Sequence, residues 1–172
     1  DRRATPTTST NAYLIKIDAA GQLQWSKEYG DESHHQRVSK IIVNNTGNYL
    51  LLGRSAEIDF APDDNEELND LDVYLLEVTP DGTLVWEQNY GDENSQEGFG
   101  IAIYQDGYVI AGKTFNSDNE SIDAYLVRIA ADGTAIWTKT YGGSETDVAN
   151  AVVATTDNHI AFVGSTGFNS NV

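Results

Sequence analysis

The sequence predicts an all-β protein that is built from three copies of one unit. Short runs rich in β-branched and aromatic residues alternate with turn residues along the chain, as in consecutive strands. No segment of helical length carries apolar residues at a period of about 3.6 residues. Segments of similar sequence also recur, and recurrence at a nearly fixed spacing is the signature of a repeat architecture.

The repeated unit is clearest around three tryptophans. The segments NAYLIKIDAAGQLQWSKEYG, DVYLLEVTPDGTLVWEQNYG and DAYLVRIAADGTAIWTKTYG begin at Asn11, Asp72 and Asp123. In each of them a Tyr precedes the Trp by 12 positions, and the Trp precedes a Tyr-Gly pair by four. The recurring residues are Tyr13, Trp25, Tyr29, Gly30, Tyr74, Trp86, Tyr90, Gly91, Tyr125, Trp137, Tyr141 and Gly142.

The units fall near residues 11–60, 72–116 and 123–167, and we expect residues 1–10 to form a linker or lead-in loop. Each unit is predicted to contain four short strands. In the run AYLVRI, the odd-numbered residues from Tyr125 to Ile129 fall on one face, and Leu126 and Arg128 on the other, as the two-residue period of a strand requires. Turn residues that tolerate positive φ separate the runs at Pro80-Asp81-Gly82, Ala131-Asp132-Gly133, Thr46-Gly47-Asn48 and Asp106-Gly107.

A period near 50 residues with four antiparallel strands per unit is typical of a β-propeller blade. With strands named A to D from the propeller axis outward, residues 11–172 order as CD, ABCD, ABCD and AB, which is 12 strands or three blades. A blade cannot bury both of its faces alone, so we expect the recurring aromatic residues to pack blade against blade. The partners of the end strands are then other blades, either in the rest of a longer chain or in a second copy that completes a ring.

Composition excludes several classes of partner. The chain has 10 Lys+Arg against 27 Asp+Glu, a net charge of −17, and such a surface repels nucleic acid and anionic lipid. It has no Cys, so disulfides, zinc-thiolate sites and Cys nucleophiles are ruled out. No apolar run is long enough for a membrane span, and we expect no membrane insertion. The absence of Met favours a processed product or a piece of a longer protein.

At the motifs DAYLVRI, DGTAIW, TYGGSETDVANAVV and FVGSTGF, the third unit resembles the bacterial seven-bladed β-propeller repeat family. The resemblance covers about residues 11–168. The first and second units depart from it at YGDESHHQRV and YGDENSQEGFG, where Gln36 aligns with Glu97 and Asp147. The resemblance implies a β-propeller in an extracellular or cell-envelope setting. The family's blade number does not carry over, because this chain holds three.

No nucleophile–base set, P-loop or dinucleotide-binding motif is present in the sequence. We therefore expect a non-enzymatic extracellular or cell-surface module, without a cofactor, that acts as a scaffold or as a binding surface for a protein or glycan. The alternative is a hydrolase or lyase whose active site lies at the propeller axis, partly outside this chain. The loop after each Tyr-Gly pair varies between units and is the favoured place for binding.

Calcium is the candidate ligand for the acidic loops. Hard cations bind several carboxylate or carbonyl oxygens on one loop, and DDNEELNDLD offers Asp63, Asp64, Asn65 and Glu67. This segment begins with EF-hand spacing but lacks the central Gly and closing Glu, so solvated acidic loops remain the alternative.

The three histidines are not expected to bind a metal. We expect His34 and His35 to form a solvated loop pair. His159 is expected to take the strand position of Tyr49 and Tyr108 and to pack there.

Overall fold

The computed structural model describes residues 9–58, 71–116 and 120–167. Within these ranges the chain forms 12 β-strands and no helix, and the strands make four antiparallel sheets. The all-β prediction is confirmed. The sheets contain two, four, four and two strands in chain order, which is the predicted grouping.

The strand bounds follow the runs between the turn residues. The strands are β1 (Ala12–Ile17), β2 (Leu23–Tyr29), β3 (His34–Val43), β4 (Tyr49–Glu57), β5 (Leu71–Val78), β6 (Leu84–Tyr90), β7 (Gln96–Tyr104), β8 (Gly107–Asn116), β9 (Ser121–Ala130), β10 (Ala135–Tyr141), β11 (Asp147–Ala154) and β12 (Ile160–Thr166). The sheets are β1-β2, β3-β4-β5-β6, β7-β8-β9-β10 and β11-β12.

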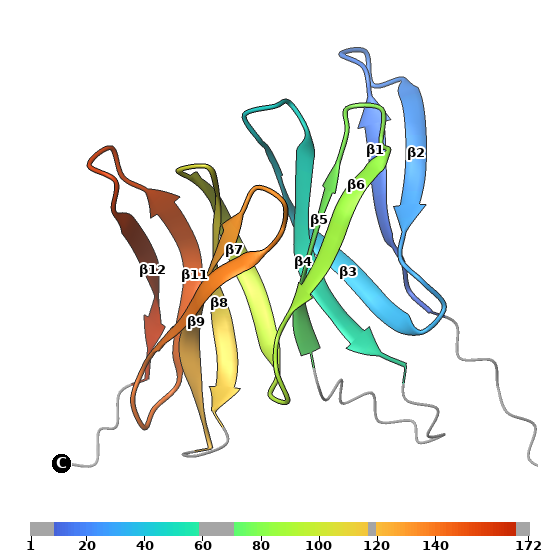
Figure 1. Cartoon of the computed structure of the whole chain (residues 1–172). Helices are drawn as coiled ribbons and strands as arrows, with labels where there is room; N and C mark the ends of the chain where they lie inside the picture. The colour runs from blue at the N-terminus through green and yellow to red at the C-terminus, as the bar shows by residue number, and fades with distance from the viewer. Residues whose placement is uncertain (1–8, 59–70, 117–119, 168–172) are drawn as a thin grey trace, which may run out of the picture.

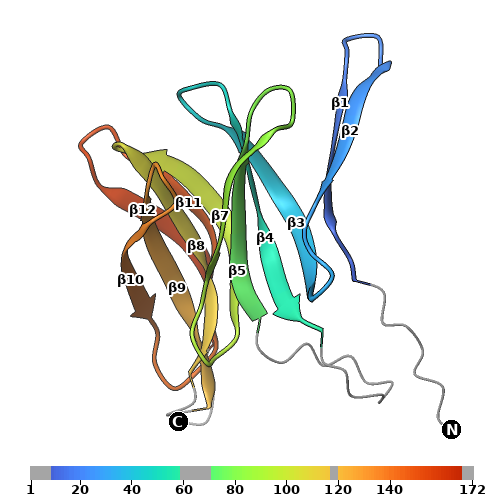
Figure 2. The ribbon, with the colours of Figure 1, turned by 45° about the vertical axis from the view of Figure 1, so that its right-hand side comes forward.

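The four sheets stand side by side in chain order, from β1–β2 at one end of the row to β11–β12 at the other (Figure 1, Figure 2). The turns β1–β2, β3–β4, β5–β6, β7–β8, β9–β10 and β11–β12 lie at the upper end of the view in Figure 1. The links that lead from one sheet to the next lie at the lower end. Because these turns all lie at one end, equivalent residues of successive units reach the same level of the row.

The core consists of three apolar clusters between neighbouring sheets. Val127 and Ile129 of β9 pack with Leu52 and Leu75 of the preceding sheet, whereas Leu126 packs with residues of β11. The predicted alternation along β9 is therefore confirmed. Full burial of one such side chain contributes about 1.5–3 kcal/mol, so the two middle sheets are stabilised through both of their faces.

Glycines at three equivalent positions let neighbouring strands approach closely. The β-bulges of β3, β7 and β11 lie opposite Gly53, Gly112 and Gly164. A Cβ atom at these glycines would lie 1.7, 1.8 and 1.6 Å from a carbonyl oxygen of the bulged strand. No side chain fits in that space, so the bulge requires glycine on the partner strand.

One of the predicted turns was wrong in detail. Gly47, Gly82 and Gly133 have positive φ as expected. At the turn between β7 and β8, positive φ falls on Gln105, and Gly107 instead begins β8. Gly107 is needed there for space, because an added Cβ would lie 2.1 Å from the Ile129 carbonyl oxygen.

Two expectations about histidine were also wrong. His34 and His35 begin β3 and are half-buried, so they do not form a loop pair. Ile160 pairs as the first residue of β12, whereas His159 lies in the turn before it and is exposed. The turns 44–48 and 155–159 have the same length between their paired strands, so His159 is the equivalent of Asn48, and Ile160 takes the strand position of Tyr49.

Candidate functional site

The Trp-x-x-x-Tyr motif of one sheet contacts the hairpin turn of the next. The Tyr29 hydroxyl donates to the Gly82 carbonyl oxygen at 2.8 Å, and the Tyr90 hydroxyl donates to the Gly133 carbonyl oxygen at 2.7 Å. The tryptophan rings lie against the same glycines, since a Cβ at Gly82 would be 3.1 Å from Trp25 and one at Gly133 would be 2.9 Å from Trp86. Each motif therefore holds two sheets together.

The third copy of the motif has no such neighbour within the described part of the chain. Trp137 packs at the edge of the third core cluster. The Tyr141 ring lies beside Phe162 of β12, with ring centroids 5.5 Å apart, and stays about half exposed. In the described residues, the last motif therefore contacts its own neighbours but no hairpin turn of a following sheet.

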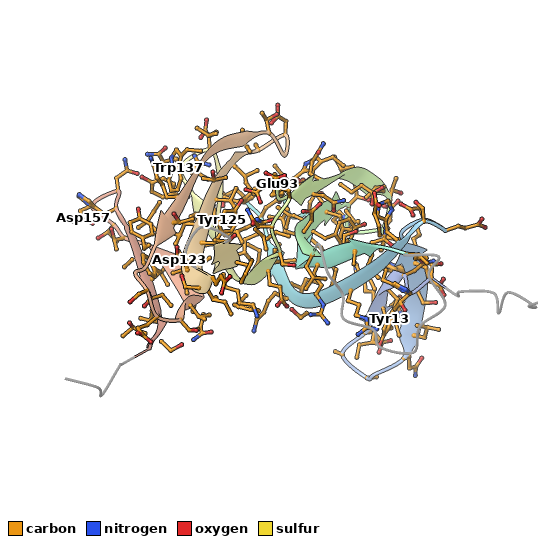
Figure 3. All side chains as sticks on the ribbon, turned by 90° about the horizontal axis from the view of Figure 1, so that it is seen from below. Tyr13, Glu93, Asp123, Tyr125, Trp137 and Asp157 are labelled. Carbon is orange, nitrogen blue, oxygen red and sulfur yellow. The ribbon has the colours of Figure 1, made fainter. Side chains whose placement is uncertain are left out.

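The first tyrosine of each unit also differs in burial between the units. Tyr74 and Tyr125 are buried between sheets, and burial raises the pKa of Tyr125 to about 12. Tyr13 lies exposed on β1, at the end of the row opposite Asp157 (Figure 3). A residue type that is core in two units is therefore surface in the first.

The glycine after each motif sits in a corner with polar side chains. A Cβ at Gly91 would lie 1.7 Å from Asp72 Oδ1 and 2.6 Å from Gln96 Oε1. Gly30 and Gly142 have matching neighbours in Asn11 with Gln36 and in Asp123 with Asp147. Gln96 is therefore the equivalent of Gln36, and the alignment of Gln36 with Glu97 was wrong. The segment from Gly91 to Gln96 is one residue shorter than the segment from Gly30 to Gln36.

In two of the variable loops after the Tyr-Gly pairs, the first acid accepts hydrogen bonds from residues of the same loop. Asp31 Oδ1 accepts from the Ser33 backbone N–H and hydroxyl, each at 2.7 Å, and the hydrogen bonds from Ser33 and His34 lower the pKa of Asp31. Asp92 Oδ1 accepts from the Asn94 backbone N–H in the same manner. Glu93, the second acid of its loop, is exposed in the link between β6 and β7 and is labelled in Figure 3.

The predicted calcium ligands Asp63, Asp64, Asn65 and Glu67 lie outside the described residues. Within residues 9–58, 71–116 and 120–167, no three His, Asp or Glu side chains lie close enough together to hold a metal ion. The same ranges contain no helix long and apolar enough to cross a membrane.

A groove between the second and third sheets carries the best candidate binding site. We call it the arginine groove: it has a volume of about 370 Å³ and is lined by Arg37, Arg54, Glu97 and Phe99, together with Val38, Ser39, Gly53 and Gly98. Arg54 Nη1 lies 2.9 Å from Glu97 Oε2, and Lys113 Nζ lies 2.9 Å from Glu97 Oε1. One carboxylate is therefore held by two cationic side chains, and Arg37 lines the same groove.

Arg37 and Arg54 form an opposed pair, because they lie directly opposite each other on β3 and β4. Like charges at directly opposite positions of a sheet repel each other and destabilise the strand pair. Glu97 is held by Arg54 and Lys113, and in the described residues no ion pair of Arg37 is seen. The groove is thus a cationic spot on a protein of net charge −17.

The pKa of Glu97 predicts how pH acts on this groove. Burial raises the pKa of Glu97, but the ion pairs with Lys113 and Arg54 together outweigh burial and leave the pKa below its usual value. The stabilisation is therefore fully present above the unfolded pKa of about 4.3 and is lost as the pH falls through the folded pKa.

We expect Glu97→Gln to lower the free energy of unfolding by about 1 kcal/mol at neutral pH. The difference from the wild type should shrink steadily as the pH falls below about 4.3. Thermal unfolding from neutral to acidic pH measures this, with the exposed Glu32→Gln as control. A difference that stayed constant with pH would contradict the prediction.

A second polar feature is buried where the second and third sheets meet. Glu77 is 5% exposed, and Asn44 Nδ2 and Asn48 Nδ2 donate to its Oε1 at 3.0 and 2.6 Å. Trp86 Nε1 donates to Oε2 at 2.9 Å. We call these four residues the Glu77 cluster. These donors are amide and indole N–H groups, and the Tyr108 hydroxyl also donates to Glu77 Oε2 at 3.5 Å. The cluster is therefore suited to joining turns and strands.

Sequence reasoning missed both features. The opposed pair depends on the register of β3 with β4, which shifts at the bulge between Val38 and Lys40. The only sequence signal was the scarcity of arginine, since two of five arginines fall in one unit. For Glu77 the signal was an acid near the end of β5, after the run Val73-Tyr74-Leu75-Leu76 that carries no charge.

Fold and site together define an all-β protein whose successive sheets are joined by a repeated aromatic motif, which contacts a hairpin turn of the next sheet. No family model matches the chain. The chain is similar to a Caulobacter vibrioides protein named "Regulatory protein FlaEY", with 29% identity over 144 residues. The match covers 74% of this chain but only 15% of that protein, so the chain corresponds to a small part of its relative.

Proposed function

We propose that the chain is a β-propeller module of the seven-bladed-repeat type, located outside the cell or in the cell envelope, and that it acts as a non-enzymatic scaffold and binding surface. The repeated contact between a Tyr hydroxyl and the next turn supports the propeller, because it stacks sheets in series. So does the close approach of β7 and β11, where a Cβ at Gly100 would lie 2.9 Å from Ala151 Cα. First strands that converge in this way are expected around a propeller axis.

The opposed pair Arg37 and Arg54 carries the proposed binding role. An Arg guanidinium binds a carboxylate through two parallel N–H donors, and a bound anion would relieve the repulsion within the pair. Phe99 lines the same groove and offers an apolar face beside the charges. A carboxylate beside an apolar surface is the chemistry of an acidic sugar, so the favoured ligand is an acidic glycan.

The test is titration of the chain with a short oligogalacturonate, followed by calorimetry at low salt. Arg37→Ala is expected to weaken binding by about tenfold or more, which is the loss of one charge-assisted contact. It should leave the melting temperature unchanged or slightly raised, because the repulsion within the pair disappears. The exposed Lys139→Ala serves as the matched control.

Equal binding by wild type and Arg37→Ala would contradict the proposed site. A neutral galactose oligomer should not bind, since it offers no carboxylate. If the oligogalacturonate were instead cleaved, with new reducing ends or unsaturated products, the alternative function as a hydrolase or lyase would be favoured.

A further inference from the structure

The two ends of the row of sheets have free edges. Among the described residues, β1 pairs only with β2, and β12 pairs only with β11. In the two middle sheets, the strands equivalent to β1 and β12 pair with each other, as β4 with β5 and β8 with β9. Each end of the chain therefore holds one half of a four-stranded sheet.

The free face of β1 is apolar. Tyr13, Ile15 and Ile17 are 65%, 48% and 59% exposed. Their equivalents Tyr74, Leu76 and Val78 are 3%, 0% and 0% exposed, because β1–β2 and its neighbours cover them. The same residue pattern that forms core within the chain is thus left at the surface on β1.

The sheet β11–β12 and the motif beside it also expose residues whose equivalents are buried. Tyr141 is 48% exposed, although Tyr29 and Tyr90 are each 7% exposed. Val163 of β12 is 68% exposed, although the equivalent Leu52 is fully buried. A groove of about 330 Å³ opens beside β12 and is lined by Tyr141, Phe162, Ser165 and Thr166.

We propose that these two ends bind each other between two copies of the chain, so that β1–β2 of one copy completes the sheet of β11–β12 of the other. The register follows from the pairs inside the chain. Gly53 pairs with Tyr74, and Gly112 pairs with Tyr125. Gly164 of one copy therefore pairs with Tyr13 of the second copy, in the groove beside Tyr141.

The turn of the second copy completes the last aromatic motif. Gly21 has a φ of 79°, as Gly82 and Gly133 have 80° and 86°. A Cβ at Gly21 would meet nothing within 4 Å, whereas Gly82 and Gly133 are covered by Trp rings. The Gly21 carbonyl oxygen is thus the acceptor that the Tyr141 hydroxyl meets in the second copy, and the Trp137 ring covers Gly21.

A second copy is the favoured occupant because each end carries the complement of the other, residue by residue. The contact joins two different surfaces, so it is heterologous and can close into a ring when both ends are used. With two copies, the ring contains six four-stranded sheets. This inference rests on the proposed propeller architecture, but it does not depend on the arginine groove, which is built from β3, β4 and β7.

The first test is the mass of the chain in solution by light scattering, where we expect twice the chain mass of 18.8 kDa. Gly21→Asn tests the contact, because Asn tolerates positive φ but places a side chain where Trp137 of the other copy must lie. It should weaken dimerisation on the order of tenfold or more. Gly47→Asn is the matched control, since Gly47 also has positive φ and open space around it.

The second test uses engineered cysteines in a chain that has none. The register pairs Ala161 with Lys16 of the second copy, whereas Ile15 points to the opposite face of β1. A mixture of Ala161→Cys and Lys16→Cys chains should form a mixed disulfide, and a mixture with Ile15→Cys should not.

A monomeric wild type, or equal cross-linking in the two mixtures, would overturn the proposal. A monomer that still bound oligogalacturonate through Arg37 would leave the proposed binding role intact. A dimer that bound no oligogalacturonate would overturn the binding role alone.

Discussion

Gly112→Ala is expected to lower the free energy of unfolding by about 3 kcal/mol, at the upper end of the cost of inserting an atom into a packed interior. The added Cβ would lie 1.8 Å from the Glu97 carbonyl oxygen and 2.8 Å from the Glu97 carbonyl carbon. Both contacts are to backbone, so relief requires β7 and β8 to separate. Urea unfolding followed by Trp fluorescence measures the change.

Gly143→Ala is the matched control for this substitution. A Cβ at Gly143 would meet nothing within 4 Å, and we expect a change within about 0.5 kcal/mol. Equal effects of the two substitutions would show that the bulge adapts to a side chain, contrary to the prediction.

Glu77→Gln is expected to lower the free energy of unfolding by about 1–3 kcal/mol, although the side chain keeps nearly the same shape. Both carboxylate oxygens of Glu77 accept hydrogen bonds, from Asn48 on one side and Trp86 on the other. An amide has one oxygen, so one of these buried donors then faces an NH₂ group and loses its acceptor.

A double-mutant cycle with Trp86→Phe separates this cause from a general packing defect. Removal of the indole N–H frees one oxygen position, so Glu77→Gln should cost less in the Trp86→Phe background than alone. Additive losses would contradict the proposed hydrogen-bond origin. The exposed Glu28→Gln on β2 controls for the loss of one charge.

The sequence predicted the strand inventory because the physics behind it is local. Alternation in β9 and the hairpin glycines act within a few residues, and both are visible in the printed sequence. The aligned tryptophans then predicted how strands divide among sheets, since equivalent positions of a repeat have equivalent surroundings.

The sites could not be predicted, because they depend on register and on contacts between sheets. Lys16, Glu77 and Arg128 occupy equivalent positions of the three units, yet Lys16 is half-buried whereas Glu77 and Arg128 are buried. Arg128 is held by Asp106, with 3.0 Å between Nη2 and Oδ1, and Glu77 by neutral donors. Sequence spacing cannot distinguish these outcomes, since the partners come from other strands. The bulges added a further obstacle, because one extra residue in β3 determines which arginines face each other.

The division of strands into groups of two, four, four and two means that one sequence unit supplies the last two strands of one sheet and the first two strands of the next. If a whole unit were gained or lost during evolution, the described strands would therefore still begin and end with a two-stranded sheet. The new junction would reuse contacts such as the hydrogen bond between Tyr90 and Gly133. A gene built from such units can change its copy number without needing a new interface.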